Sequence, residues 1–120
     1  MNILFLRPNR FIRNELRECV SDMQGQAYFA ASTEEAVTIL NAQPIDIFFL
    51  ELKECTETGL LKYIYEHFKN VRIILTAESG IKDAISIIRK THFDVLRKPF
   101  ALKEVRDILV GHREGLKIDN

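Results

Sequence analysis

The sequence predicts an α/β fold, a doubly wound parallel sheet of five strands alternating with five helices, and three observations support this prediction. The chain has 120 residues, which is the size of one domain, and 47% of them are hydrophobic, enough to form a core. Short apolar runs alternate with longer segments whose apolar residues recur every three or four positions. Several of the short runs are almost wholly apolar, which is typical of parallel strands covered by helices on both faces.

Five strands are expected over the short apolar runs Ile3 to Leu6, Ala27 to Ala30, Ile45 to Leu50, Val71 to Leu75 and Phe93 to Leu96. Because the connections between parallel strands are right-handed, these runs and their intervening helices make a (βα)5 sandwich. Such a sheet binds its ligands beyond the carboxyl ends of its strands, so the residues that follow each strand are the first candidates for a site.

The first two helices have recognisable ends. The buried residues of the first are expected to be Phe11, Ile12, Leu16, Cys19, Val20 and Met23, and this helix should stop near Gly25. The second opens with a capping box, in which Ser32 and Glu35 each bind a backbone N–H of the first turn.

The last three helices are expected after Gly59, from about Gly80, and after Phe100, each with apolar residues at i, i+3 and i+4. Their inward residues are Leu60, Leu61, Ile64 and Phe68, then Ile81, Ala84, Ile85 and Ile88, then Leu102, Val105, Ile108 and Leu109. We expect one domain over residues 1–110, followed over 111–120 by a polar tail or the start of a linker.

Composition excludes several classes of function. Seventeen Lys and Arg balance 17 Asp and Glu, so a direct nucleic-acid partner is not expected. No apolar run is long enough to span a membrane, which predicts a cytoplasmic protein with no membrane partner. The two cysteines and three histidines lack metal-ligand spacing, so no metal site is expected from them.

Four strand ends carry polar or charged residues, namely Arg7-Pro8-Asn9, Glu51, Thr76 and Lys98-Pro99. This layout resembles the receiver domain of the response regulators of bacterial two-component systems, a (βα)5 flavodoxin-like fold. The segments that carry the resemblance are Asp46 to Glu51, Gly59, Ile74 to Ala77 and Phe93 to Phe100. The last of them, with the helix over Ile81 to Ile88, is most similar to receivers of enhancer-binding transcriptional activators.

The resemblance implies a role for each strand-end position. Glu51 stands where receivers carry the phospho-accepting aspartate, and Arg7 and Pro8 stand where they carry two acidic Mg²⁺ ligands. Thr76 and Lys98 match the hydroxyl and the ammonium that bind the phosphoryl oxygens, which makes them an anion clamp. Pro99 is a candidate for a cis peptide bond that directs the lysine toward the site. Val95 replaces the aromatic residue that usually acts as a switch.

These departures predict a degenerate receiver, or pseudo-receiver. Mg²⁺ needs oxygen ligands, and neither Arg7 nor Pro8 offers one, so Mg²⁺ binding is expected to be lost. The predicted function is signal transduction by protein–protein interaction, with no enzymatic activity and no cofactor. Two alternatives stay open: a working receiver that accepts a phosphoryl group from a histidine kinase, and a small-anion sensor that uses Arg7, Lys53 and Lys98.

The expected partners are a histidine kinase or another signalling protein, an effector domain C-terminal to Asn120, or a second copy of the chain. The candidate interface lies on the fourth helix, the fifth strand and the fifth helix, and includes Ile87, Val95, Arg97 and Arg106. Ile87 is surplus apolar surface on its helix, and Lys90, Lys103 and Asp107 add to a charged rim. We also expect Arg7 or Lys98 to contact the Glu51 carboxylate directly.

Overall fold

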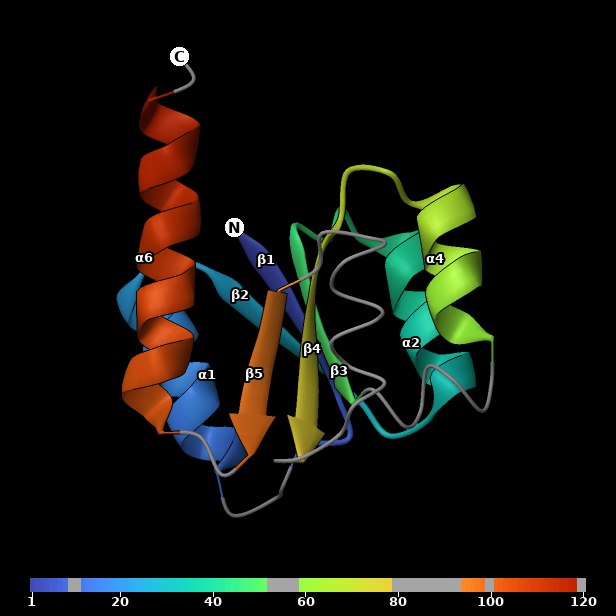
Figure 1. Cartoon of the computed structure of the whole chain (residues 1–120), viewed down its shortest axis with the longest axis horizontal. Helices are drawn as coiled ribbons and strands as arrows, with labels where there is room; N and C mark the ends of the chain where they lie inside the picture. Colours follow the sequence, from blue (N-terminus) through green and yellow to red (C-terminus); the bar gives the residue numbers. More distant parts are fainter. Residues whose placement is uncertain (9–11, 52–58, 79–93, 99–100, 119–120) are drawn as a thin grey trace.

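The computed structural model describes residues 1–8, 12–51, 59–78, 94–98 and 101–118, and it contains one parallel sheet with helices on both faces (Figure 1). The strands are β1 (Asn2–Leu6), β2 (Gln26–Ala30), β3 (Ile47–Glu51), β4 (Arg72–Glu78) and β5 (Asp94–Lys98). The helices are α1 (Arg13–Asp22), α2 (Thr33–Ala42), α4 (Leu60–His67) and α6 (Leu102–Ile118). The predicted α/β class and all five strands are confirmed, and the helix expected from Gly80 lies outside the described residues.

The strand order is β2-β1-β3-β4-β5, so the chain reverses direction across the sheet between β1 and β3. All four neighbouring pairs are parallel. This is a doubly wound sheet, and the point where the order reverses is where such sheets place a ligand crevice.

Two hydrophobic cores lie on opposite faces of the sheet. Alternate residues of β3 enter them in turn: Phe48 and Leu50 pack with α2 and α4, whereas Ile47 and Phe49 pack with α1 and α6. Figure 1 shows these two pairs of helices on either side of the strands. Because both faces are covered, the central strands are apolar throughout, which is why the sequence shows them as uninterrupted runs.

Helix α1 ends near Gly25, as expected, and its end forms a Schellman motif. The N–H of Gln24 donates to Ser21 O at 2.9 Å and the N–H of Gly25 donates to Val20 O at 3.0 Å. Gln24 takes the left-handed conformation, with φ 59°. Gly25 is needed for a different reason, because a Cβ there would lie 2.7 Å from the carbonyl oxygen of Met1.

The starts of α2 and α4 agree with the sequence. The Ser32 hydroxyl caps α2 by accepting from Glu35 N at 3.1 Å, which confirms the predicted cap. The Glu35 carboxylate accepts from Ala31 N at 3.3 Å, one residue before the usual partner of a capping box. Gly59 precedes α4 with φ 70°, a conformation that glycine adopts without strain.

Helix α6 is longer than its buried residues indicate. Val105 and Leu109 are buried and Ile108 is half-buried, as expected, but the helix continues through Gly111 to Ile118. The segment predicted as a tail is therefore helical up to Ile118, and its role as a linker stays a prediction. No helix within the described ranges has the length and apolar character needed to cross a membrane.

Candidate functional site

The carboxyl edge of the sheet brings Glu51 and Thr76 together. They form the last registered pair between β3 and β4. By strand alternation, Glu51 lies on the same side of the sheet as Phe49, and Thr76 on the same side as Ile74, both of which belong to the core under α1 and α6. Glu51 is half-buried, and Thr76 is only 7% exposed. A carboxylate and a hydroxyl thus share one end of the sheet, as the sequence predicts.

The Thr76 hydroxyl is bound to the neighbouring strand. It donates to the carbonyl oxygen of Leu50 across 3.4 Å, which is at the long limit for a hydrogen bond of this type. A bond this long is weak, so an anion at the edge of the sheet would compete well for the same donor. This geometry is compatible with the predicted role of Thr76 in an anion clamp, which stays a prediction.

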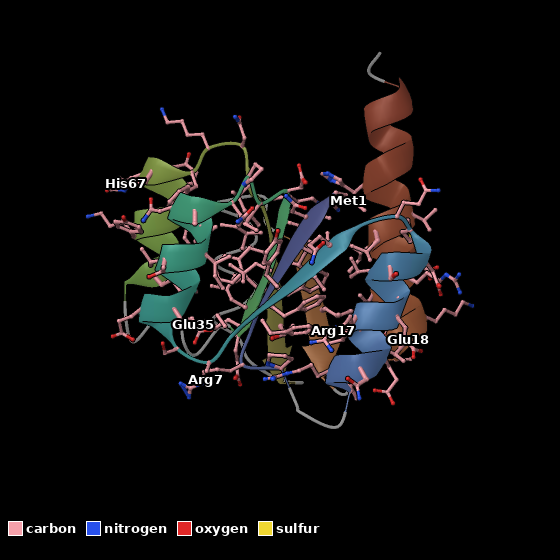
Figure 2. The ribbon with its side chains drawn as sticks, turned by 180° about the vertical axis from the view of Figure 1, so that it is seen from behind. Met1, Arg7, Arg17, Glu18, Glu35 and His67 are labelled. Carbon is pink, nitrogen blue, oxygen red and sulfur yellow. The ribbon has the colours of Figure 1, made fainter. Side chains whose placement is uncertain are left out.

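Arg7 and Pro8 follow β1 directly, next to β3 in the sheet. Arg7 is exposed and has φ 49°, a left-handed conformation that is costly for a residue with a Cβ. Its N–H donates to Ala30 O at 2.8 Å, so the backbone at the end of β1 is fixed to the end of β2. Figure 2 shows Arg7 at this edge of the molecule. A cation therefore lies at the position that the sequence resemblance assigns to an acidic metal ligand, and this assignment stays a prediction.

Lys98 is the last residue of β5. Its backbone is in register with Glu78, two residues beyond the pair formed by Thr76 and Leu96. The fold thus brings the ends of β1, β3, β4 and β5 to one edge. The contact expected between Glu51 and Arg7 or Lys98 stays a prediction, and Pro99 and Lys53 lie outside the described residues.

The candidate interface is described only in part. Ile87 lies outside the described residues, while Val95 and Arg97 are placed by their backbone, in register with Leu75 and Ala77. Arg106 is exposed on α6. Burial raises the pKa of the Cys19 thiol on α1, and the positive charge of Arg106 opposes this rise. Arg106 is therefore close enough to α1 for its charge to act there.

Sequence reasoning missed an aromatic ladder beneath this edge. Phe5 stacks on Phe29 with ring centroids 5.5 Å apart and on Phe49 at 5.0 Å, each with an interplanar angle of 18°. The Arg13 and Arg17 guanidinium carbons lie 5.3 and 5.1 Å from the Phe29 ring centroid. Aligning the three strands at their carboxyl ends would have shown the aromatic row, because each phenylalanine is one or two residues from its strand end.

Metal ligands do not gather in the described part of the chain. Among those residues no group of three or more His, Cys, Asp or Glu side chains is placed to hold a metal ion.

Comparisons with known proteins agree with the fold. No protein-family model matches the chain. The virulence transcriptional regulatory protein PhoP of Salmonella typhimurium is 28% identical over 108 residues, which cover 88% of this chain and 48% of PhoP. The chain thus spans about half the length of the curated relatives it matches.

Two solved structures have a similar fold. NtrX from Brucella abortus superposes with a TM-score of 0.76 and 25% identity, covering 98% of this chain and 27% of NtrX. The signal receiver domain of a LuxO-type repressor from Vibrio parahaemolyticus gives a TM-score of 0.80 at 17% identity, covering 98% and 93% of the two chains.

The sheet order and these similarities agree with the fold of response-regulator receiver domains. The likeness of the chain to PhoP and NtrX fits a receiver of the kind found in transcriptional regulators.

Proposed function

We propose that this receiver is degenerate and signals by protein–protein interaction, without Mg²⁺-dependent phosphorylation of an aspartate. The observation that carries the proposal is the pair Arg7 and Pro8 directly after β1, at the edge where Glu51 ends β3. The substitutions at both strand ends act in the same direction, because each removes a group on which phosphoryl transfer in receivers depends.

Charge is the first argument against a metal-dependent reaction. Mg²⁺ binds oxygen ligands in near-octahedral geometry and usually takes one or two carboxylates from the protein. Pro8 has no side-chain oxygen, and the Arg7 guanidinium repels a divalent cation. Glu51 would have to bind Mg²⁺ beside that cation. We therefore expect calorimetry to detect no saturable Mg²⁺ binding that depends on Glu51.

The length of the Glu51 side chain suggests a role for the carboxyl edge of the sheet other than phosphorylation. Its carboxylate extends one methylene further than an aspartate, toward the space that the oxygens of an aspartyl phosphate would fill. Thr76 is paired with Glu51 in the sheet, and Lys98 is the last residue of β5, the strand next to β4. A permanent carboxylate held by Lys98 or Arg7 would keep the edge in one charge state. The interaction surface would then be fixed rather than switched by a kinase.

Phosphorylation is tested by intact-mass spectrometry after incubation with a small-molecule phosphodonor and Mg²⁺. The wild type is compared with the restored variant Arg7→Asp/Pro8→Asp/Glu51→Asp, which returns the acidic residues to their strand ends. We expect one added phosphoryl group in the restored variant and none in the wild type. A mass gain in the wild type that is lost in Glu51→Ala would support the working receiver instead. No gain in either protein would show that these three positions do not explain the loss.

The proposed partners are a signalling protein such as a histidine kinase, an effector domain, or a second copy of the chain. Sedimentation of the wild type, Ile87→Glu and Val95→Glu tests the interface predicted over the fourth helix, β5 and α6. A pull-down with a histidine kinase compares partner capture by the same three proteins. Weaker self-association or weaker kinase capture in either variant would support that interface. Unchanged association, with the circular dichroism spectrum intact, would place the interface elsewhere.

A further inference from the structure

A second polar cluster lies at the opposite, amino edge of the sheet, where α6 passes the start of β4. His112 is half-buried, two residues beyond the last core contacts of α6. Its Nδ1 lies 3.4 Å from Nη1 of Arg72, the first residue of β4. This contact joins residues 40 positions apart in the sequence. It attaches the segment predicted as a tail to the body of the domain.

The base of this contact is firmly held. The N–H of Arg72 donates to Asp46 O at 2.9 Å, and the N–H of Asp46 donates to Asn2 O at 2.9 Å. The Asp46 carboxylate accepts in turn from the N–H of Asn2 at 2.7 Å. These bonds connect the start of β4 to β1 through the residue that precedes β3. Arg72 is therefore presented to α6 from a fixed backbone.

The chemistry of the contact depends on one proton. A guanidinium has only donors, so the imidazole must accept through Nδ1 and carry its proton on Nε2. Protonation of Nδ1 removes the acceptor and sets two cations against each other. We propose that His112 is a proton-sensitive latch, which holds the C-terminal half of α6 to the sheet when neutral and releases it when protonated.

The charges around the imidazole favour the latched form. Burial lowers the pKa of His112 below its ordinary value of 6.5, the Arg72 cation lowers it further, and Asp46 acts in the opposite direction. Nearer the start of α6, the charge of Arg106 lowers the pKa of the Cys19 thiol on α1, and the charge of Asp22 on α1 raises it.

The lowered pKa gives the sign of the pH effect. Between the folded pKa and about 6.5, the folded protein carries a neutral His112 while the unfolded chain is protonated. The stabilisation is complete above about pH 6.5 and is lost as the pH falls through the folded pKa. Mild acid should therefore loosen the contact between α6 and β4 before it affects the core.

The release would affect the direction of α6. Figure 1 shows the C-terminal half of this helix extending beyond the start of the strands. Val105 and Leu109 are buried and keep the first half of α6 in the core. The part after Leu109 would therefore tilt or fray once the contact between His112 and Arg72 is lost. This device lies at the edge opposite Glu51, and it does not depend on whether the receiver is phosphorylated.

The test is nuclear magnetic resonance on the whole chain at pH about 5.5 and about 7.5, on either side of the ordinary imidazole pKa. Amide exchange over residues 109–116 is expressed as protection factors, which removes the intrinsic pH dependence of exchange. We expect protection to fall by about two- to threefold at the lower pH in the wild type, the low end for one hydrogen bond, because the contact is 3.4 Å long. In His112→Gln, which cannot be protonated, we expect no such fall.

Two further variants distinguish a latch from general acid loosening. His67→Gln is the matched control, because His67 is also helical but its ring nitrogen bonds to Tyr63 O within α4, at 2.9 Å. It should behave like the wild type. Arg72→Met removes the partner and should raise the pKa of His112. A fall in protection that persists in His112→Gln, protection that does not change with pH in the wild type, or an unchanged His112 titration in Arg72→Met would each overturn the proposal.

Discussion

Replacing Phe5 by leucine should destabilise the domain strongly, because Phe5 is the middle ring of the aromatic ladder. Phe5 is 3% exposed and stacks on a ring at each side. Each stacked pair contributes about 0.5–1.5 kcal/mol beyond the burial of area, so two pairs account for about 1–3 kcal/mol. The smaller leucine also leaves a void that costs roughly 0.5–1 kcal/mol. We expect the free energy of unfolding to fall by about 1.5–4 kcal/mol.

Urea denaturation followed by circular dichroism measures this loss. With a slope of about 2 kcal/mol per molar urea, the middle of the usual range, the midpoint should drop by roughly 1–2 M. Phe68→Leu is the control, because Phe68 is half-buried and tilted by 58° against its aromatic neighbour Tyr63. It should lose less, about 1 kcal/mol. A double-mutant cycle between Phe5 and Phe29 should give a coupling of about 0.5–1.5 kcal/mol, and a coupling near zero would refute the stacking argument.

Three other substitutions test the helix ends by thermal or urea unfolding. Gly25→Ala should lower the free energy of unfolding by about 1–3 kcal/mol, since its Cβ would lie 2.7 Å from Met1 O, and an unchanged midpoint would mean that the turn relaxes freely. Gln24→Gly should raise stability by up to about 1 kcal/mol by relieving its φ of 59°, whereas a loss would show that the side chain of Gln24 is needed. Ser32→Ala should cost about 1 kcal/mol through the lost bond to Glu35 N, with Ser32→Asp restoring it; equal losses in both variants would contradict a capping role.

The strands and helices could be predicted because each is marked by local chemistry. Apolar runs mark strands that are buried on both faces, and the Ser32 cap marks the first turn of α2. Strand limits were less accurate, since β3 starts at Ile47 and not at Ile45, and β4 extends to Glu78. Those limits depend on which strand lies alongside, and a single sequence does not contain that information.

The conformation at the end of α1 was missed for a physical reason. The helix ends near Gly25, as expected, but the left-handed residue there is Gln24. The glycine is needed for its lack of a Cβ beside Met1, a contact between distant parts of the chain. The contact between Arg72 and His112 was missed for the same reason, since its two residues are 40 positions apart. For the candidate site, the sequence predicts which residues lie at the strand ends, but not how their side chains contact one another.

The separation between the two cores and the carboxyl edge has a consequence for how such a domain can change over time. The buried residues Leu6 and Leu50 are the last of their strands to enter the core, and Arg7 and Glu51 come directly after them. Exchanging the residues at the edge leaves both cores intact. The reaction chemistry of a receiver can therefore be lost by a few substitutions without loss of the folded shape. A partner that recognises only that shape would continue to bind, and binding alone would then preserve the domain.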